Sequence, residues 1–230
     1  MPRQKKTEIC PLGGVGVGGK LKFQIWHLLL DGPRRFGELQ RLIPRASRQM
    51  LTIQLRELEQ AGALRRKVYE QMPPKVEYSL TEMGRSIEPI VRQMYDWGEW
   101  YGEQIGQDID WLVRLSGRWT FWIWYHLLDG PRRFSELQRL IPRASRQILA
   151  IQLRELEHMG VLYRKATVQE SPKVEYSLTE LGKRSEPMLR QMYAWGRWYC
   201  EQNGLEYNWP VCDEPEVRMD FSPALVIPSA

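Results

Sequence analysis

The chain has 230 residues and a formal net charge of +5 at pH 7, with a mass of 27.3 kDa and a pI of about 9.1. This length fits one large or two small domains, and a hydrophobic content of 43% can build a core, which argues against a disordered chain. No apolar run approaches the roughly 18 residues that a membrane helix needs, and the basic N-terminus lacks the apolar stretch of a signal peptide.

Three cysteines, Cys10, Cys200 and Cys212, are far apart and odd in number. This pattern favours free thiols in the reducing cytoplasm over a disulfide framework. The basic balance hints at a polyanionic partner, although a charge of +5 over this length is modest. We therefore expect a cytoplasmic protein that does not insert into a membrane.

A tandem repeat organises the chain. The segment DGPRRFGELQRLIPRASRQMLTIQLRELEQAG at 31–62 recurs as DGPRRFSELQRLIPRASRQILAIQLRELEHMG at 129–160, so a residue of the first copy corresponds to the residue 98 positions later. A period this long describes a domain and not a solenoid unit. The sequence therefore predicts one domain over 1–106, a second over 107–203 and an irregular acidic tail over 204–230.

Each copy is predicted to begin with three helices. In the first copy, residues 21–30 are apolar and aromatic, and the following Asp-Gly-Pro stops that helix. Residues 34–43 are predicted as a second helix, followed by a tight connection. Its apolar face consists of Phe36, Leu39, Leu42 and Ile43.

The third helix has clear start and stop signals. Ser47 is a suitable N-cap, and Gly62 is a suitable end. Between them, Leu51, Leu55 and Leu58 follow spacings of four and three, which puts them on one buried face.

A hairpin and a long helix complete each copy. Residues 64–70 and 76–80 are predicted as two strands joined by a long basic loop, and Thr81 as the cap of a helix reaching Gln104, bent by Pro89. This order is typical of a winged helix-turn-helix. We therefore predict a mainly α protein with small β-hairpins (α+β), consisting of two tandem winged helix-turn-helix domains related by a pseudo-two-fold.

The outer face of the third helix carries residues that suit DNA. The second helix of a helix-turn-helix presents its N-terminal side chains to base edges in the major groove. Arginine can bind guanine, glutamine can bind adenine, and threonine or isoleucine can contact a thymine methyl, while turn and wing cations suit phosphates or a narrow minor groove. The predicted DNA-binding residues are Arg45, Arg48, Gln49, Thr52, Ile53, Arg56, Arg65, Arg66, Lys67 and Lys75 in the first copy, and Arg143, Arg146, Gln147, Ala150, Ile151, Arg154, Arg164, Lys165 and Lys173 in the second.

A merely solvated helix face is the alternative to this reading surface. It is disfavoured because the helix start contains several cations and no acidic residue before Glu57. Two such readers predict two similar half-sites, and a pseudo-two-fold would make a near-palindrome with its halves about one helical turn, or a multiple, apart. Thr52 is replaced by Ala150 in the second copy, and Met50 by Ile148, so we expect the half-sites to diverge where Thr52 and Ala150 point.

The motifs resemble the HxlR-type bacterial transcription regulators, which are close to the MarR-like winged helices. Such regulators are single-domain chains that bind DNA as homodimers and act as repressors or activators. The resemblance therefore implies a transcriptional regulator, more often a repressor, in which one chain is a built-in dimer or two chains form a homodimer. The residues that carry it are Gly18-Gly19-Lys20, 29–36 (LLDGPRRF), Glu38-Leu39, Ser47, Leu51-Thr52, 55–58 (LREL), Pro74, 76–82 (VEYSLTE) and Gly84.

The resemblance also implies a candidate redox sensor. Many relatives carry an N-terminal Cys-Pro that senses oxidants or electrophiles, and Cys10-Pro11 matches it. The glycine-rich 12–19 departs from the apolar helix of those relatives, and the second copy has Asp108 at the cysteine position. An inert thiol is the alternative.

An aromatic stripe repeats in the two copies. Ile90, Met94, Trp97 and Tyr101 follow a heptad-like spacing that usually packs against another helix. The alternative is an interdomain pocket for a small aromatic effector. The candidate residues for either role are Trp97, Tyr101, Trp119, Trp122, Trp195 and Tyr199.

Other chemistry has little support in the sequence. The glycine-rich 14–19 matches a nucleotide-binding pattern, but no buried strand precedes it and no Ser or Thr follows Lys20. The three histidines have no partner at ligand spacing, so we expect neither a metal, nor a cofactor, nor an enzyme. The expected function is therefore sequence-specific binding of double-stranded DNA, and the alternative is a winged-helix protein-interaction module.

Overall fold

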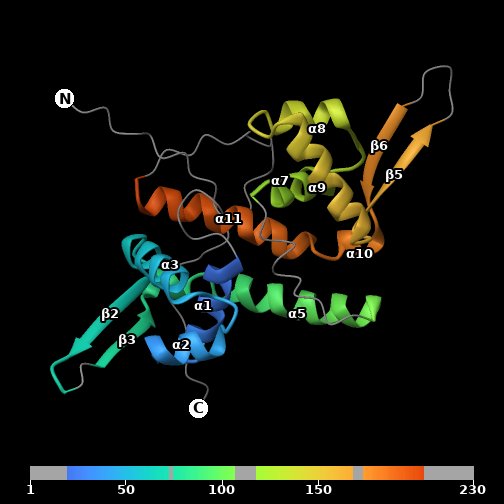
Figure 1. The fold of residues 1–230 in the computed structure, drawn as a ribbon. Coiled ribbons are helices and arrows are strands. Elements are labelled where there is room, and N and C mark those ends of the chain that lie inside the picture. Colours follow the sequence, from blue (N-terminus) through green and yellow to red (C-terminus); the bar gives the residue numbers. More distant parts are fainter. Residues whose placement is uncertain (1–19, 73–74, 107–117, 168–172, 205–230) are drawn as a thin grey trace, which may run out of the picture. The chain divides into compact units, whose positions relative to one another are not determined.

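The computed structural model describes residues 20–72, 75–106, 118–167 and 173–204 (Figure 1). They form two compact units. Unit 1 contains the described residues of 20–95 together with 194–204, and unit 2 contains the described residues of 96–193. None of the described helices is long and apolar enough to cross a membrane.

The described part of unit 1 begins with three helices, followed by a small sheet and a short fourth helix. The sheet has the antiparallel order β1-β3-β2, and its β2–β3 hairpin projects away from helices α1 to α3 (Figure 1). The elements are α1 (Lys20–Leu30), β1 (Arg34–Arg35), α2 (Phe36–Leu42), α3 (Arg48–Gln60), β2 (Leu64–Tyr69), β3 (Lys75–Leu80), α4 (Glu82–Arg85) and the start of α5 (Glu88–Ile105).

Unit 2 repeats this order. Its sheet has the order β4-β6-β5. The elements are α7 (Arg118–Leu128), β4 (Arg132–Arg133), α8 (Phe134–Leu140), α9 (Arg146–His158), β5 (Leu162–Thr167), β6 (Lys173–Leu178), α10 (Glu180–Lys183) and the start of α11 (Glu186–Gln202). The prediction of a mainly helical protein with small antiparallel β-structure and two tandem winged helix-turn-helix domains is confirmed.

Helix α3 follows its sequence signals. The Ser47 hydroxyl accepts a hydrogen bond of 3.1 Å from the Met50 amide, as an N-cap does. The predicted leucine stripe is fully buried, and Gly62, just beyond the helix, has a φ of +72° that favours glycine. Ser145 caps α9 in the same way.

The predicted second helix is wrong at its start. Arg34 and Arg35 do not belong to it, because they pair with Tyr78 and Glu77 and form the edge strand β1. The predicted hairpin is therefore part of a three-stranded sheet. Leu42, assigned above to the apolar face, is exposed.

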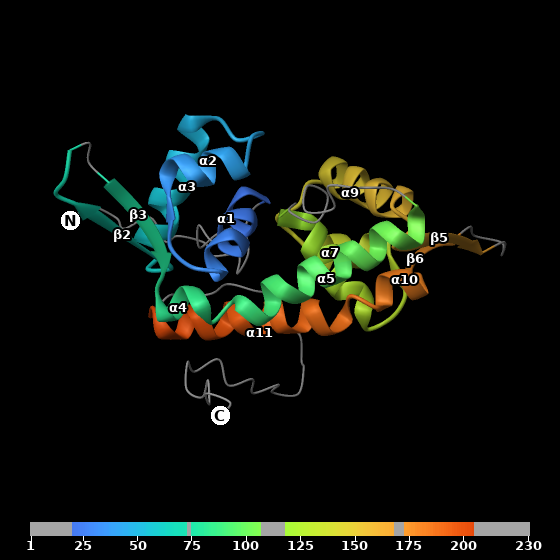
Figure 2. The ribbon, with the colours of Figure 1, turned by 90° about the horizontal axis from the view of Figure 1, so that it is seen from below.

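The predicted single helix from Thr81 to Gln104 is also wrong, because it is two helices (Figure 2). Thr81 caps only the short α4, accepting a hydrogen bond from the Gly84 amide. Pro89 cannot donate a backbone hydrogen bond, so it ends a continuing helix but is tolerated in the first turn of α5.

Helix α4 lies in tight contact with the end of the third helix. The Ala63 carbonyl accepts a hydrogen bond from the Thr81 amide, and a Cβ atom added to Gly84 would lie 2.0 Å from that carbonyl oxygen. The indole of Trp26 donates to the Gly84 carbonyl at 2.9 Å. Gly84 is therefore required by close backbone approach.

The last helix of each repeat is divided between the two units. Residues 88–95 of α5 belong to unit 1 and its remainder to unit 2, while α11 starts in unit 2 and its residues from 194 onward belong to unit 1. In unit 1, Trp195 packs edge-on against Trp26, with ring centroids 6.1 Å apart. The two repeats thus exchange parts of their final helices. The boundaries of the compact units therefore differ from the boundaries of the sequence repeats at these helices.

Candidate nucleic-acid interface

The outer face of α3 carries the predicted reading residues. Arg48, Gln49 and Arg56 are exposed, and so is Ile53. Thr52 is half-buried, and its hydroxyl donates a 2.8 Å hydrogen bond to the Arg48 carbonyl, which leaves its methyl group and oxygen lone pairs for a partner. The buried leucine stripe on the opposite face holds this surface outward.

The first arginine of each reading helix is oriented by an aromatic ring. The Arg48 guanidinium lies over Phe36, 5.4 Å from the ring centroid, and Arg146 lies over Phe134 at 5.7 Å. Such cation–π contacts favour one arrangement of a long side chain. The helix starts therefore present partly preorganised guanidinium groups.

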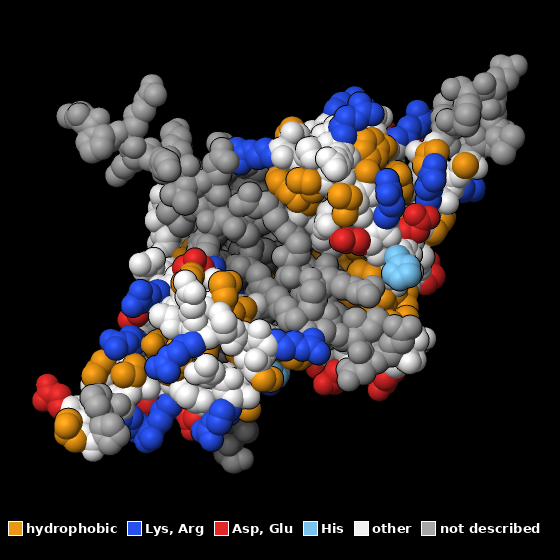
Figure 3. Space-filling view, viewed as in Figure 1, with side chains coloured by type: hydrophobic (Ala, Val, Ile, Leu, Met, Phe, Trp, Pro, Cys, Tyr) orange, Lys and Arg blue, Asp and Glu red, His pale blue; other side chains and the backbone are white. Residues whose placement is uncertain are grey.

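Helix α9 has the same arrangement. Arg146, Gln147, Ile151 and Arg154 are exposed, and Ala150 is half-buried at the position of Thr52. The turn residues Arg45 and Arg143 are exposed as well. Figure 3 shows Lys and Arg side chains on the visible faces of both units.

An exposed apolar residue also lies in the first turn of α3 and of α9. Met50 is 49% exposed and Ile148 is 40% exposed. In the sequence these two residues stand out only as a difference between the copies. Their position three residues after the N-cap serine was a usable signal, because the N-terminal residues of a recognition helix reach the bases.

The wing of unit 1 is held together by an aromatic and ionic cluster. Lys67 and Lys75 lie over the ring of Tyr69, 4.8 and 4.6 Å from its centroid. The Tyr69 hydroxyl donates to one oxygen of Glu77 at 2.7 Å, and the Lys75 ammonium lies 2.6 Å from the other. The hydrogen bonds from Lys75 and then Tyr69 lower the pKa of the Glu77 carboxyl, which keeps the cluster ionised.

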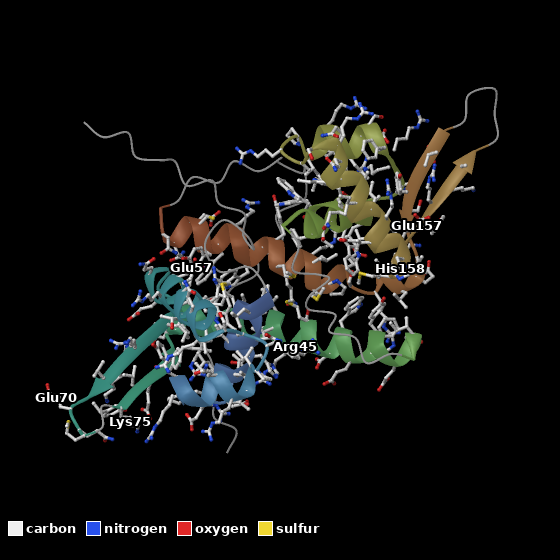
Figure 4. All side chains as sticks on the ribbon, in the orientation of Figure 1. Arg45, Glu57, Glu70, Lys75, Glu157 and His158 are labelled. Atoms are coloured by element: carbon white, nitrogen blue, oxygen red, sulfur yellow. The ribbon has the colours of Figure 1, made fainter. Side chains whose placement is uncertain are left out.

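The predicted wing cations of unit 1 differ in their exposure to solvent. Arg65, Arg66 and Lys67 are exposed, whereas Lys75 is half-buried beside Glu77. Figure 4 shows Lys75 on the hairpin and Arg45 at the other side of the same unit. The predicted contacts therefore extend across the whole unit.

A hollow of about 400 Å³ lies where the wing meets α2 and α3. Four of its lining residues are cationic, and none is acidic. An anionic group is the ligand chemistry that this lining favours. The lining residues are Arg35, Phe36, Gly37, Arg48, Arg66, Gln71, Lys75, Val76 and Tyr78.

The wing of unit 2 is built differently. Arg164 and Lys165 are exposed, as predicted, whereas the side chain of Lys173 lies outside the described residues. Thr167 stands at the position of Tyr69. The Glu175 carboxylate here binds Arg133, with Nε and Oε1 3.4 Å apart.

The candidate aromatic residues are divided between the units. Trp97, Tyr101, Trp119 and Trp122 belong to unit 2, and Trp195 and Tyr199 to unit 1. All except Trp119 are buried. Stacked pairs such as Trp97–Tyr101, with centroids 5.0 Å apart, favour packing as their role.

Among the described residues, Cys200 and His126 are buried. Cys10 and Cys212 lie outside the described residues, and burial raises the pKa of the Cys200 thiol to about 11, which keeps it protonated and unreactive. Burial also lowers the pKa of His126 to about 4. No group of three or more potential metal ligands occurs in the part of the chain that the structure describes.

Two stretches of the sequence, residues 16–106 and 114–204, match the model of the HxlR-like helix-turn-helix family. The chain belongs to this family. YdeP of Bacillus subtilis, an uncharacterized HTH-type transcriptional regulator, is 53% identical over 89 residues, which cover 39% of this chain and 70% of YdeP. YybR of the same organism, described in the same words, is 55% identical over 83 residues, covering 36% of this chain and 66% of YybR.

Solved structures are also similar to parts of the chain. The redox regulator HypR in its oxidized form is 55% identical, with 36% of this chain and 86% of HypR covered and a TM-score of 0.36. The reduced transcriptional regulator YodB from B. subtilis is 37% identical, with 39% and 87% covered and a TM-score of 0.35. This chain has two matches to the family model, whereas its alignments with YdeP and YybR each cover a single stretch. It is a helix-turn-helix DNA-binding transcriptional regulator.

Proposed function

We propose that this HxlR-like regulator binds one near-palindromic operator in double-stranded DNA, reading one half-site with α3 and a similar half-site with α9. The supporting observation is that one chain presents two almost identical exposed faces, each starting with an arginine held over a phenylalanine ring. The residues on these faces and wings are the contact residues predicted from the sequence. Repression of nearby genes in the cytoplasm is the regulatory outcome that we propose.

A selection of duplexes from a random library with the full chain tests this proposal. We expect two similar half-sites about one helical turn or a multiple apart, differing where Thr52 and Ala150 point. Unrelated half-sites would contradict the proposal of two equivalent readers. Solution mass of the complex distinguishes one chain acting as a built-in dimer from two chains acting as a homodimer.

Removal of the oriented arginines tests which residues read bases. Each good arginine–guanine pair contributes about 1–3 kcal/mol of discrimination. Arg48→Ala and Arg146→Ala should therefore each relax preference in one half-site by about tenfold or more. Arg41→Ala in α2 is the control, because Arg41 lies on another helix and should leave base preference unchanged.

A protein-interaction module is the second candidate function. DNA binding through several phosphates falls steeply as salt rises, because condensed counterions are released. We expect that steep salt dependence for the selected duplex. Weak, salt-insensitive binding to every duplex, unchanged by Arg48→Ala, would favour the interaction module.

An oxidant or electrophile acting at Cys10 is the regulation that the family resemblance suggests for this operator. Loss of DNA binding on treatment with a quinone or diamide, abolished by Cys10→Ser, would support it. An unchanged response in that variant would leave the buried aromatic residues as candidates for an aromatic effector, which tryptophan fluorescence can test.

A further inference from the structure

The two wings differ in what binds their central glutamate. Glu77 and Glu175 occupy equivalent positions in their sheets. Each pairs with an arginine on the neighbouring edge strand, Glu77 with Arg35 and Glu175 with Arg133. In unit 2, Arg133 binds Glu175 at 3.4 Å. In unit 1, the two oxygens of Glu77 are bound by Tyr69 and Lys75.

This difference changes the state of the edge-strand arginine. Tyr69 and Lys75 bind the Glu77 carboxylate directly, whereas the exposed Arg35 guanidinium acts on it only through its charge and forms no ion pair with a carboxylate among the described residues. Its counterpart Arg133 is exposed too, but its charge is paired. The two repeats share the lysine, as Lys75 and Lys173, but the second has Thr167 where the first has Tyr69, and a threonine side chain is shorter than the reach of a tyrosine hydroxyl.

Arg35 also borders the cationic hollow between wing and helices. Arg48, Arg66 and Lys75 line the same hollow, so several positive charges surround a space of about 400 Å³ without an acidic lining residue. A phosphodiester carries one negative charge on two oxygens, a geometry that arginine binds with paired hydrogen bonds. The hollow opens between two elements that both contact DNA in the proposed function.

We propose that the hollow of unit 1 holds a backbone phosphate of the operator, that Arg35 binds this phosphate, and that Tyr69 is a positioning residue which keeps Glu77 from capturing Arg35. The second repeat lacks the tyrosine, so Arg133 contributes little to DNA affinity. The two repeats therefore bind their half-sites with unequal affinity. This inference rests on the proposed DNA-binding function. It adds Arg35 and Tyr69 to the residues predicted from the sequence.

The matched positions of the two repeats provide the test. Affinity of the full chain for its selected duplex is measured over a salt series for the wild type, Arg35→Ala and Arg133→Ala. We expect Arg35→Ala to weaken binding about tenfold for all sequences and to reduce the salt slope by about one. Arg133→Ala should weaken binding less than about threefold.

Exchange of the tyrosine tests its positioning role. Tyr69→Thr should free Glu77 to bind Arg35, so affinity should fall and a further Arg35→Ala should add little. Thr167→Tyr should make the second repeat sensitive to Arg133→Ala. Thermal melting of each variant, expected to match the wild type at these exposed arginines, shows that altered binding is not altered folding.

A chemical probe locates the phosphate. In a duplex with one neutral methylphosphonate at the phosphate beside the wing of the first half-site, Arg35→Ala should cause no further loss. Equal effects of Arg35→Ala and Arg133→Ala, or full additivity with the methylphosphonate at every position, would overturn this inference while leaving DNA binding intact. A wild type that binds no selected duplex would instead refute the proposed function.

Discussion

The hydroxyl of Tyr199 donates a 2.7 Å hydrogen bond to the carbonyl of Ala61, the residue that ends the reading helix α3. Tyr101 makes the corresponding 2.6 Å bond to Met159 at the end of α9. Each tyrosine comes from the final helix of the other repeat. Within each unit, the end of the third helix is therefore hydrogen-bonded to a helix that the other repeat contributes.

Removal of these hydroxyl groups should destabilise the protein. Tyr199→Phe and Tyr101→Phe each leave a carbonyl without its donor, which costs about 1–2 kcal/mol and lowers Tm by about 2–8 °C for a chain of this length. Differential scanning calorimetry measures the change. Tyr163→Phe is the control, because Tyr163 is 47% exposed, and an equal shift in all three variants would contradict this role.

His126 should make stability depend on pH. Burial, and then the charge of Arg132, lower the pKa of His126 from 6.5 to about 4, against an opposing effect of Asp129. Between these values the unfolded chain binds a proton that the folded chain does not, so stability should fall as pH drops from about 6.5 to about 4. The expected slope is at most about 1.4 kcal/mol per pH unit.

Replacement of His126 by the residue of the first repeat tests that assignment. The corresponding position is Leu28, so His126→Leu is a matched substitution. Urea unfolding at several pH values should show a shallower acid loss in this variant than in the wild type. Parallel curves for the two proteins between pH 6.5 and 4 would show that another group titrates.

Removal of Glu57 and removal of Lys22 should lower the free energy of unfolding by different amounts. Their charged atoms are 2.6 Å apart, but the lysine side chain is 5% exposed and the glutamate 41%. Glu57→Gln should therefore cost more, about 2–3 kcal/mol, because it leaves a buried ammonium poorly compensated, whereas Lys22→Met leaves a carboxylate that water can solvate.

The second repeat provides the control for this pair. The lysine is replaced there by Thr120, whose hydroxyl binds the side chain of Gln152, so Glu155→Gln should have a small effect. Chemical denaturation measures all three variants. A larger loss for Lys22→Met than for Glu57→Gln would contradict the argument from burial.

Gly84 and Gly182 should not tolerate a side chain. A Cβ atom would lie 2.0 Å from the carbonyl oxygen of Ala63 or Val161, so each glycine-to-alanine change should cost about 3 kcal/mol or more. Gly37→Ala in α2 has open space and should be neutral or stabilise by up to about 1 kcal/mol. Far-UV circular dichroism melting compares them, and a tolerated Gly84→Ala would argue against the tight junction.

Local sequence signals predicted much of the fold and which residues α3 exposes. Ser47 lies immediately before an apolar stripe with helical spacing, and capping and burial of that stripe depend only on neighbours along the chain. This is why α3, its buried leucines and its exposed Arg48 and Gln49 agree with the prediction. The order of strand, turn and strand in the sequence also predicted that the wing carries cations.

Pairing between distant segments explains the errors. Arg34 and Arg35 carry no strand pattern, and their extended conformation depends on the free edge of β3. The short helix α4 approaches Ala63 closely at Gly84, a contact that no spacing rule contains. The cationic hollow and the different partners of Glu77 and Glu175 likewise arise from side chains that the sheet brings together.

The sequence by itself determined that the chain is two copies of a winged helix-turn-helix and which helix face carries the cations, because repetition, capping and amphipathic spacing are local properties. Only the tertiary structure decided where the final helices pack. Both copies have a tryptophan at the same position, Trp26 and Trp124, so the spacing of the stripe containing Tyr199 does not specify which copy it contacts. Its bond to Ala61, 138 positions earlier in the chain, shows that the exchanged arrangement was chosen by packing and not by proximity in sequence.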